Sequence, residues 1–127
     1  MAAWAQPAEL GEADRAAIRE VIRGQLDAFR RDDGPAAFAY ASPEIQRQFQ
    51  TAELFMHMVR QGYPQVYWAR EADFRDLETV GGAPTQLVLV VGANGTAALA
   101  AYRMQRQPDG SWRIDGCVLL RSGESAT

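Results

Sequence analysis

Several residue types are scarce in this chain, and each scarcity excludes a class of site. Of 127 residues, one is cysteine, one is histidine, and all 13 basic residues are arginine. A single cysteine excludes an internal disulfide and a cysteine-rich metal site, and a single histidine excludes a histidine-rich zinc site. No stretch approaches the ~20 apolar residues that a membrane-spanning helix requires. We therefore expect no metal, no cofactor and no membrane partner.

The net charge and the length of the chain narrow the possible partners and the number of domains. The net charge of −3 argues against a nucleic-acid partner, because phosphate binding needs concentrated positive charge. Residues 1–7 lack the positive region and the apolar core of a signal peptide, so we expect a cytoplasmic protein. The length predicts one domain over residues 12–121, with loose termini at residues 1–11 and 122–127.

The C-terminal half of the chain is patterned as strands separated by turns. The predicted strands span residues 72–80, 86–92, 96–107 and 111–121. Asn94-Gly95 and Asp109-Gly110 supply the positive φ angles that tight hairpin turns need. The sequence therefore predicts an antiparallel meander that ends in two consecutive β-hairpins.

Upstream of the strands, apolar residues recur at helical spacing. The predicted helices span residues 12–31, 36–41, 44–49 and 51–61. Asp33-Gly34 and Ser42 each stand just before a proline, a pattern typical of N-cap residues followed by a helix start. Gln25 falls on a buried side and needs a hydrogen-bond partner. Residues 65–71 fit either a loop or a strand. Helices followed by a meander predict an α+β fold, with three to four helices packed on a strongly bent four-stranded sheet.

The last turn sets a register for the sheet. A three-residue loop over residues 108–110 pairs Met104 with Ile114 and places Arg103 opposite Asp115 as a cross-strand ion pair. The helix-facing side of the sheet is then predicted to carry Leu87, Leu89, Val91, Ala98, Ala100, Tyr102, Met104, Trp112, Ile114, Val118 and Leu120.

The opposite side of the predicted sheet is also apolar at one end. The residues assigned to it are Val88, Val90, Leu99, Ala101, Cys117 and Leu119. A second apolar face on an antiparallel sheet is usually covered. We therefore predict a homodimer that buries this outer face.

No residue cluster forms a catalytic signature. His57 falls opposite the apolar stripe of its helix and is expected to face solvent. Asp115 has Arg103 as its partner in the predicted register. Asp32 and Asp33 lie at a helix junction, where capping is the expected role rather than acid–base chemistry.

Aromatic side chains are the remaining signal of a site. The residues predicted to line a pocket between helices and sheet are Tyr40, Phe49, Phe55, Tyr63, Tyr102 and Trp112. Aromatic rings form apolar walls, and their hydroxyl and N–H groups orient a ligand. The alternative is a filled core, because a chain of this size encloses only a modest cavity.

Two blocks of the sequence resemble the domain of unknown function 4864 family. They comprise residues 25–29, Asp33, residues 37–43, Phe49, residues 55–59 and Tyr63 in the helical half, and Tyr102, residues 109–114 and residues 116–117 in the sheet half. Helices wrapped over a bent meander resemble the cone of the nuclear transport factor 2-like superfamily, which includes SnoaL-like enzymes. The resemblance implies a cone-shaped, cystatin-like fold, a cavity between helices and sheet, and dimerisation through the outer sheet face. It implies no activity.

Three functions remain open at this point. The leading hypothesis is a small dimeric domain that holds an unidentified apolar or aromatic ligand. The second is a cofactor-independent SnoaL-like enzyme, of the isomerase, cyclase or dehydratase class, which uses tyrosines and one carboxylate. The third is a ligand-free interaction module. A polar cavity favours the enzyme, an aromatic cavity favours binding, and a filled core favours the module.

Overall fold

The computed structural model describes residues 10–120. Within them, five helices precede a four-stranded antiparallel sheet of order β1-β2-β3-β4. The helices are α1 (Glu12–Arg30), α2 (Gly34–Ala39), α3 (Pro43–Phe49), α4 (Ala52–Gly62) and α5 (Pro64–Tyr67), and the strands are β1 (Ala69–Val80), β2 (Ala83–Gly92), β3 (Ala97–Arg106) and β4 (Trp112–Leu120). The α+β class is confirmed. The predicted loose termini fall almost wholly outside the described residues.

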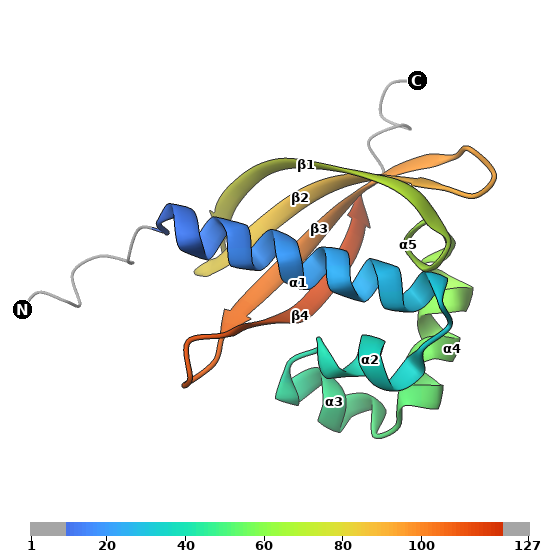
Figure 1. The fold of residues 1–127 in the computed structure, drawn as a ribbon, viewed down its shortest axis with the longest axis horizontal. Coiled ribbons are helices and arrows are strands. Elements are labelled where there is room, and N and C mark those ends of the chain that lie inside the picture. The colour runs from blue at the N-terminus through green and yellow to red at the C-terminus, as the bar shows by residue number, and fades with distance from the viewer. Residues whose placement is uncertain (1–9, 121–127) are drawn as a thin grey trace, which may run out of the picture.

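The strands bend around α1, which runs across one face of the sheet, while α2, α3 and α4 gather beside its C-terminal half (Figure 1). The buried side of α1 carries Ile18, Ile22 and Phe29, each at most 1% exposed. Trp112 and Ile114 of β4 belong to the same core and are 5% exposed. The core therefore lies between α1 and the sheet, as the helical spacing of apolar residues predicts.

Local capping starts the middle helices where the sequence predicts. Asp33 accepts a hydrogen bond from the backbone N–H of Ala36, and Ser42 accepts one from Ile45, at 3.1 and 3.2 Å. Thr51 caps α4 in the same way through Leu54. These side chains satisfy backbone donors that a helix leaves free at its first turn.

The helix count exceeds the prediction because of α5. This one-turn helix occupies the start of the segment that fits either a loop or a strand, and β1 then begins at Ala69 rather than at residue 72. Pro64 stands in the first turn of α5, a position that proline favours. The short helix leads the chain from α4 to the edge of the sheet.

The β3–β4 hairpin has the predicted register next to its turn. Met104 pairs with Ile114, and Arg106 pairs with Trp112. Further along, the register shifts, so that Arg103 pairs with Gly116 instead of Asp115. The predicted ion pair nevertheless forms, with Arg103 Nε 3.3 Å from the Asp115 carboxylate.

This shift reverses the predicted faces of the end of β4. Beyond it, Cys117 pairs with Tyr102 and Leu119 pairs with Ala100, so both lie on the helix-facing side. Val118 and Leu120, predicted to be inside, are 58% and 41% exposed. The correction has a physical reason, since one extra residue in a strand moves every later side chain to the opposite face.

The β2–β3 hairpin reverses the predicted faces of β2 as well. Val88 pairs with Ala100 and Val90 pairs with Ala98, and both valines are fully buried under the helices. Gly92 and Thr96 close the turn, so its loop has three residues. The predicted faces require a loop of two residues. The outer face of the sheet therefore carries Leu87, Leu89, Val91, Leu99, Ala101, Val118 and Leu120. Of the predicted dimer-face residues, only Leu99 and Ala101 lie on it.

Candidate functional site

A cavity of about 260 Å³ lies between the helices and the β3–β4 side of the sheet. Its walls come from every helix except α2 and from two strands. The lining residues are Gln25, Phe29, Ala41, Ile45, Gln48, Phe49, Phe55, Met58, Val59, Tyr63, Val66, Tyr102, Ile114, Gly116 and Cys117. The segment between α2 and α3 closes one side, because Ser42 N–H donates to the Ile114 carbonyl at 2.8 Å.

The helical wall of the cavity is aromatic. The ring of Phe55 on α4 lies 6.0 Å from Phe29 and 5.6 Å from Phe49, measured between ring centroids. Such spacings are within the favourable range for aromatic pairs, which hold each other in place. Gln25, also at the cavity, donates its side-chain N–H to the Ala37 carbonyl at 3.1 Å, which supplies the partner that its burial requires.

The sheet wall brings weakly polar groups to the cavity. Tyr102 is fully buried, and its hydroxyl oxygen has no hydrogen-bond partner among the described residues. The Cys117 thiol lies beside it without meeting hydrogen-bond geometry. Cys117 faces the cavity because the register shift before it turns this end of β4 inward, and such irregularities often redirect side chains at sites.

These polar groups are neutral at physiological pH. Burial raises the pKa of Tyr102 well above its ordinary value, and the neighbouring thiol raises it further. Burial also raises the pKa of Cys117 to about 12 and, with that thiol, the pKa of Tyr63. Among the described residues that line the cavity, none carries a formal charge. The cavity is therefore apolar to weakly polar and uncharged.

The structure places four of the predicted pocket residues at the cavity: Phe49, Phe55, Tyr63 and Tyr102. Tyr40 and Trp112 are not among its lining residues. Tyr40 packs on Gly24, where a Cβ atom would overlap the phenol hydroxyl. Trp112 packs under the Arg106 guanidinium, 4.7 Å from its ring centroid. The pattern of aromatic residues alone does not separate the two groups. Cys117 was missed because it was assigned to the opposite face.

The candidate acids lie outside the cavity. Asp115 accepts a hydrogen bond from the buried Ser42 hydroxyl at 2.6 Å. Asp33 caps α2, as expected. Asp32 does not cap this helix; it accepts a hydrogen bond from the Tyr67 hydroxyl and pairs with Arg60 at 3.7 Å. His57 on α4 is exposed, as predicted.

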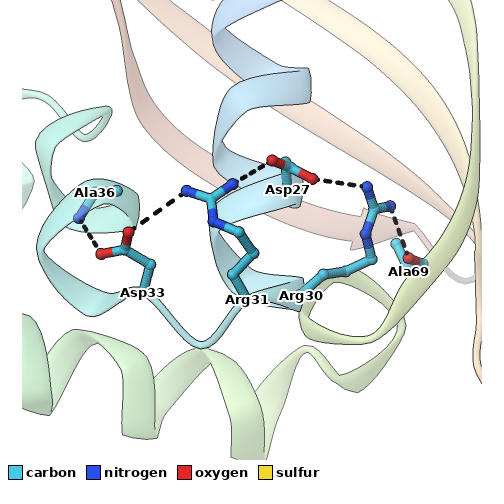
Figure 2. A network of polar contacts seen from close by, with 6 residues as sticks. All are labelled: Asp27, Arg30, Arg31, Asp33, Ala36 and Ala69. Atoms are coloured by element: carbon cyan, nitrogen blue, oxygen red, sulfur yellow. Dashed lines mark hydrogen bonds and ion pairs between the residues drawn. The ribbon is translucent and has the colours of Figure 1, made fainter.

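A polar network on the surface joins the end of α1 to its neighbours (Figure 2). Arg31 bridges Asp27 and Asp33, while Arg30 contacts Asp27 and the carbonyl of Ala69, the first residue of β1. These charged side chains are about half exposed, so each pair contributes roughly 0–1 kcal/mol. The network organises a helix junction rather than a reactive centre.

Residues 10–120 contain neither a metal-binding cluster nor a membrane-spanning helix. No group of three or more histidine, cysteine, aspartate or glutamate side chains is arranged to hold a metal ion there. No helix in the same range is both long and apolar enough to cross a membrane.

The comparisons with known proteins identify a family but no activity. The chain matches no curated protein and no solved structure. Residues 11–127, nearly the whole chain, match the family described as Domain of unknown function (DUF4864). The protein therefore belongs to the DUF4864 family.

Proposed function

We propose that this protein binds a small, mainly apolar or aromatic molecule in the cavity between its helices and its sheet. The observation that carries the proposal is a space of about 260 Å³ bordered by phenylalanine rings on one wall and by Tyr102 on the other. An engineered apolar cavity of roughly 150 Å³ already holds benzene. The space here is large enough for one substituted ring.

The lining residues favour binding over catalysis. General acid–base catalysis works best with a group whose pKa lies near the operating pH. The tyrosine and cysteine pKa values here are shifted away from neutrality, and a thiol is nucleophilic only as the thiolate. A SnoaL-like enzyme would need a carboxylate at the cavity, and none is found among the described lining residues. A ligand-free module would need no cavity.

Thermal melting with toluene as the probe tests the proposal. Met58 on α4 lines the cavity, so Met58→Trp should fill it and abolish the rise in melting temperature that toluene produces. Leu54→Trp is the matched control, because Leu54 lies one turn earlier on α4 and is 55% exposed. Toluene should stabilise the wild type and Leu54→Trp alike. Absence of any effect on the wild type would overturn the proposal in favour of the ligand-free module.

We also propose a homodimer through the outer sheet face as the structure defines it. This face carries leucine, valine and alanine on three adjacent strands, and Val118 and Leu120 remain substantially exposed. Burial of such a surface yields roughly 25 cal/mol per Å². The bent sheet with helices on its inner side also supports placing the family in the nuclear transport factor 2-like superfamily, whose resemblance implies the same interface.

A second copy is the proposed occupant, because a two-fold axis places this apolar face against its own copy. Arg103 and Asp73, which lie on this face, already pair within the chain with Asp115 and Arg75. Light scattering should give about twice the 14.0 kDa mass of the chain, and a monomer at micromolar concentration would refute the dimer.

A further inference from the structure

We infer that the ligand is a neutral molecule with one hydrogen-bond acceptor on an apolar or aromatic body, and that the Tyr102 hydroxyl donates to this acceptor. The inference rests on the proposed function and deepens it, because it names the chemical class of the ligand. It follows from three observations: an unpaired donor on the sheet, an uncharged lining, and the position of the phenylalanine rings on the helical wall.

The first observation is the unpaired hydroxyl of Tyr102. This side chain is fully buried, yet its oxygen has no hydrogen-bond partner among the described residues. Buried polar groups are paired in the great majority of cases, by protein, by water or by ligand. The adjacent Cys117 sulfur is only a weak acceptor. A carbonyl or ether oxygen of a ligand would be a stronger partner for the hydroxyl proton.

The second observation is the absence of charge among the described lining residues. A carboxylate or ammonium ion transferred into this cavity would lose its hydration without gaining a counter-charge, which is strongly unfavourable. The cavity therefore selects against ionised ligands. The Gln25 amide does not alter this, since its N–H group already donates to the Ala37 carbonyl.

The third observation is the division of the cavity into two walls. Phe29, Phe49 and Phe55 come from the helices, as do the amides of Gln25 and Gln48. Tyr102 and Cys117 come from β3 and β4. An aromatic body packed on the helical wall directs its acceptor toward the sheet wall. Tyr63, at the start of α5, borders the same cavity as Cys117.

Three one-ring probes of similar size test the inference: acetophenone, isopropylbenzene and benzoate. Acetophenone carries a neutral acceptor, isopropylbenzene replaces the carbonyl by a carbon, and benzoate is charged. One net hydrogen bond corresponds to about a tenfold difference in Kd. Acetophenone should therefore bind the wild type about tenfold more tightly than isopropylbenzene, and benzoate should bind most weakly. Ligand-observed NMR titrations give the three constants.

Tyr102→Phe isolates the hydroxyl. In this variant the Kd of acetophenone should rise until it matches that of isopropylbenzene, whose own Kd should stay within a factor of about two. Tyr40→Phe is the matched control, because Tyr40 lies outside the cavity, and it should keep the wild-type preference.

Each outcome decides between the inference and the function on which it rests. Equal binding of acetophenone and isopropylbenzene by the wild type would overturn the acceptor inference and leave the apolar binding function standing. Tightest binding of benzoate would overturn the neutral class. Failure of all three probes to bind would refute the binding function itself. Retention of the preference in Tyr102→Phe would assign the donor to another group and refute the role of Tyr102.

Discussion

The two faces of the sheet are both apolar but have different surroundings. On β2, Val88 and Val90 face the helices and are fully buried, whereas Leu87, Leu89 and Val91 face outward and are only partly covered. The residues on the two sides of this strand are nevertheless almost equally hydrophobic, since both sides carry only valine or leucine here. The difference teaches that hydrophobicity alone does not reveal which side of a strand packs on the core, and that a partly covered apolar side is available for association.

Matched charged substitutions on β2 should give the largest difference between the faces. Val90→Asp places a carboxylate in the core without a partner, at a cost of about 5 kcal/mol or more, which is comparable with the whole stability of a small domain. We expect this variant not to fold. Leu89→Asp, one residue earlier, should keep the wild-type circular dichroism spectrum and abolish the dimer. A folded Val90→Asp protein would show that the faces are assigned wrongly.

Truncation of Trp112 should give the next largest effect. This side chain is 5% exposed and packs between α1 and the sheet, so Trp112→Ala is expected to cost about 3–5 kcal/mol. Val80→Ala is the control, because Val80 is 53% exposed at the end of β1, and it should change the free energy of unfolding by less than about 0.5 kcal/mol. Urea denaturation measures both. A cost below about 1 kcal/mol for Trp112→Ala would contradict its place in the core.

The inward direction of Cys117 predicts a loss of stability in mild alkali. Its pKa is raised to about 12 in the folded protein, whereas an unfolded thiol ionises near about 8.5. Below about pH 8 both states are protonated, and above it the unfolded state loses its proton first, so stability falls as the pH rises toward the folded pKa. The loss at about pH 9.5 is roughly 1.4 kcal/mol.

Urea melts at about pH 8 and about pH 9.5 measure this loss. Cys117→Ala should show a smaller pH dependence than the wild type. An outward thiol would give no such difference and would react rapidly with a thiol reagent in the native state.

Replacement of the glycines in the two hairpin turns should give the smallest effect on stability, and the effect should be the same in both turns. Gly95 and Gly110 have φ angles of 87° and 91°, in the left-handed region that side chains disfavour. Gly95→Ala and Gly110→Ala should each cost about 1 kcal/mol. Gly62→Ala is the control, because Gly62 has no positive φ angle and open space around it, and it should cost nothing. Unequal costs for the two turns would show that their geometries differ.

The two turns also explain why the sheet was predicted only in part. Both have the same hydrogen bonds: the glycine N–H donates to the first residue of the turn, Gly92 or Gln107, at 2.9 Å. Three residues lie between the closing pair in each. The prediction used this length for the second turn, where it was confirmed, but not for the first. Nothing in the sequence signals the extra residue at Asp115, because a strand irregularity depends on what packs against it.

The candidate site was predicted in part for a related reason. Phe49, Phe55, Tyr63 and Tyr102 border the cavity, whereas Tyr40 and Trp112, which are equally aromatic, do not. Aromatic composition indicates which side chains are suited to a cavity wall. Which of them border the space depends on how helices far apart in the chain pack on β3 and β4.

The sequence by itself determined the features that depend on a few neighbouring residues. Asp33 and Ser42 start helices because their side chains reach backbone donors three residues ahead, and glycine turns the chain where φ must be positive. Only the tertiary structure decided which face of β2 is buried and that Cys117 points inward. The physical reason is the two-residue period of a strand, since one residue more in a turn or a strand exchanges its two faces. When both faces are apolar, only packing against the helices shows which of them forms the core.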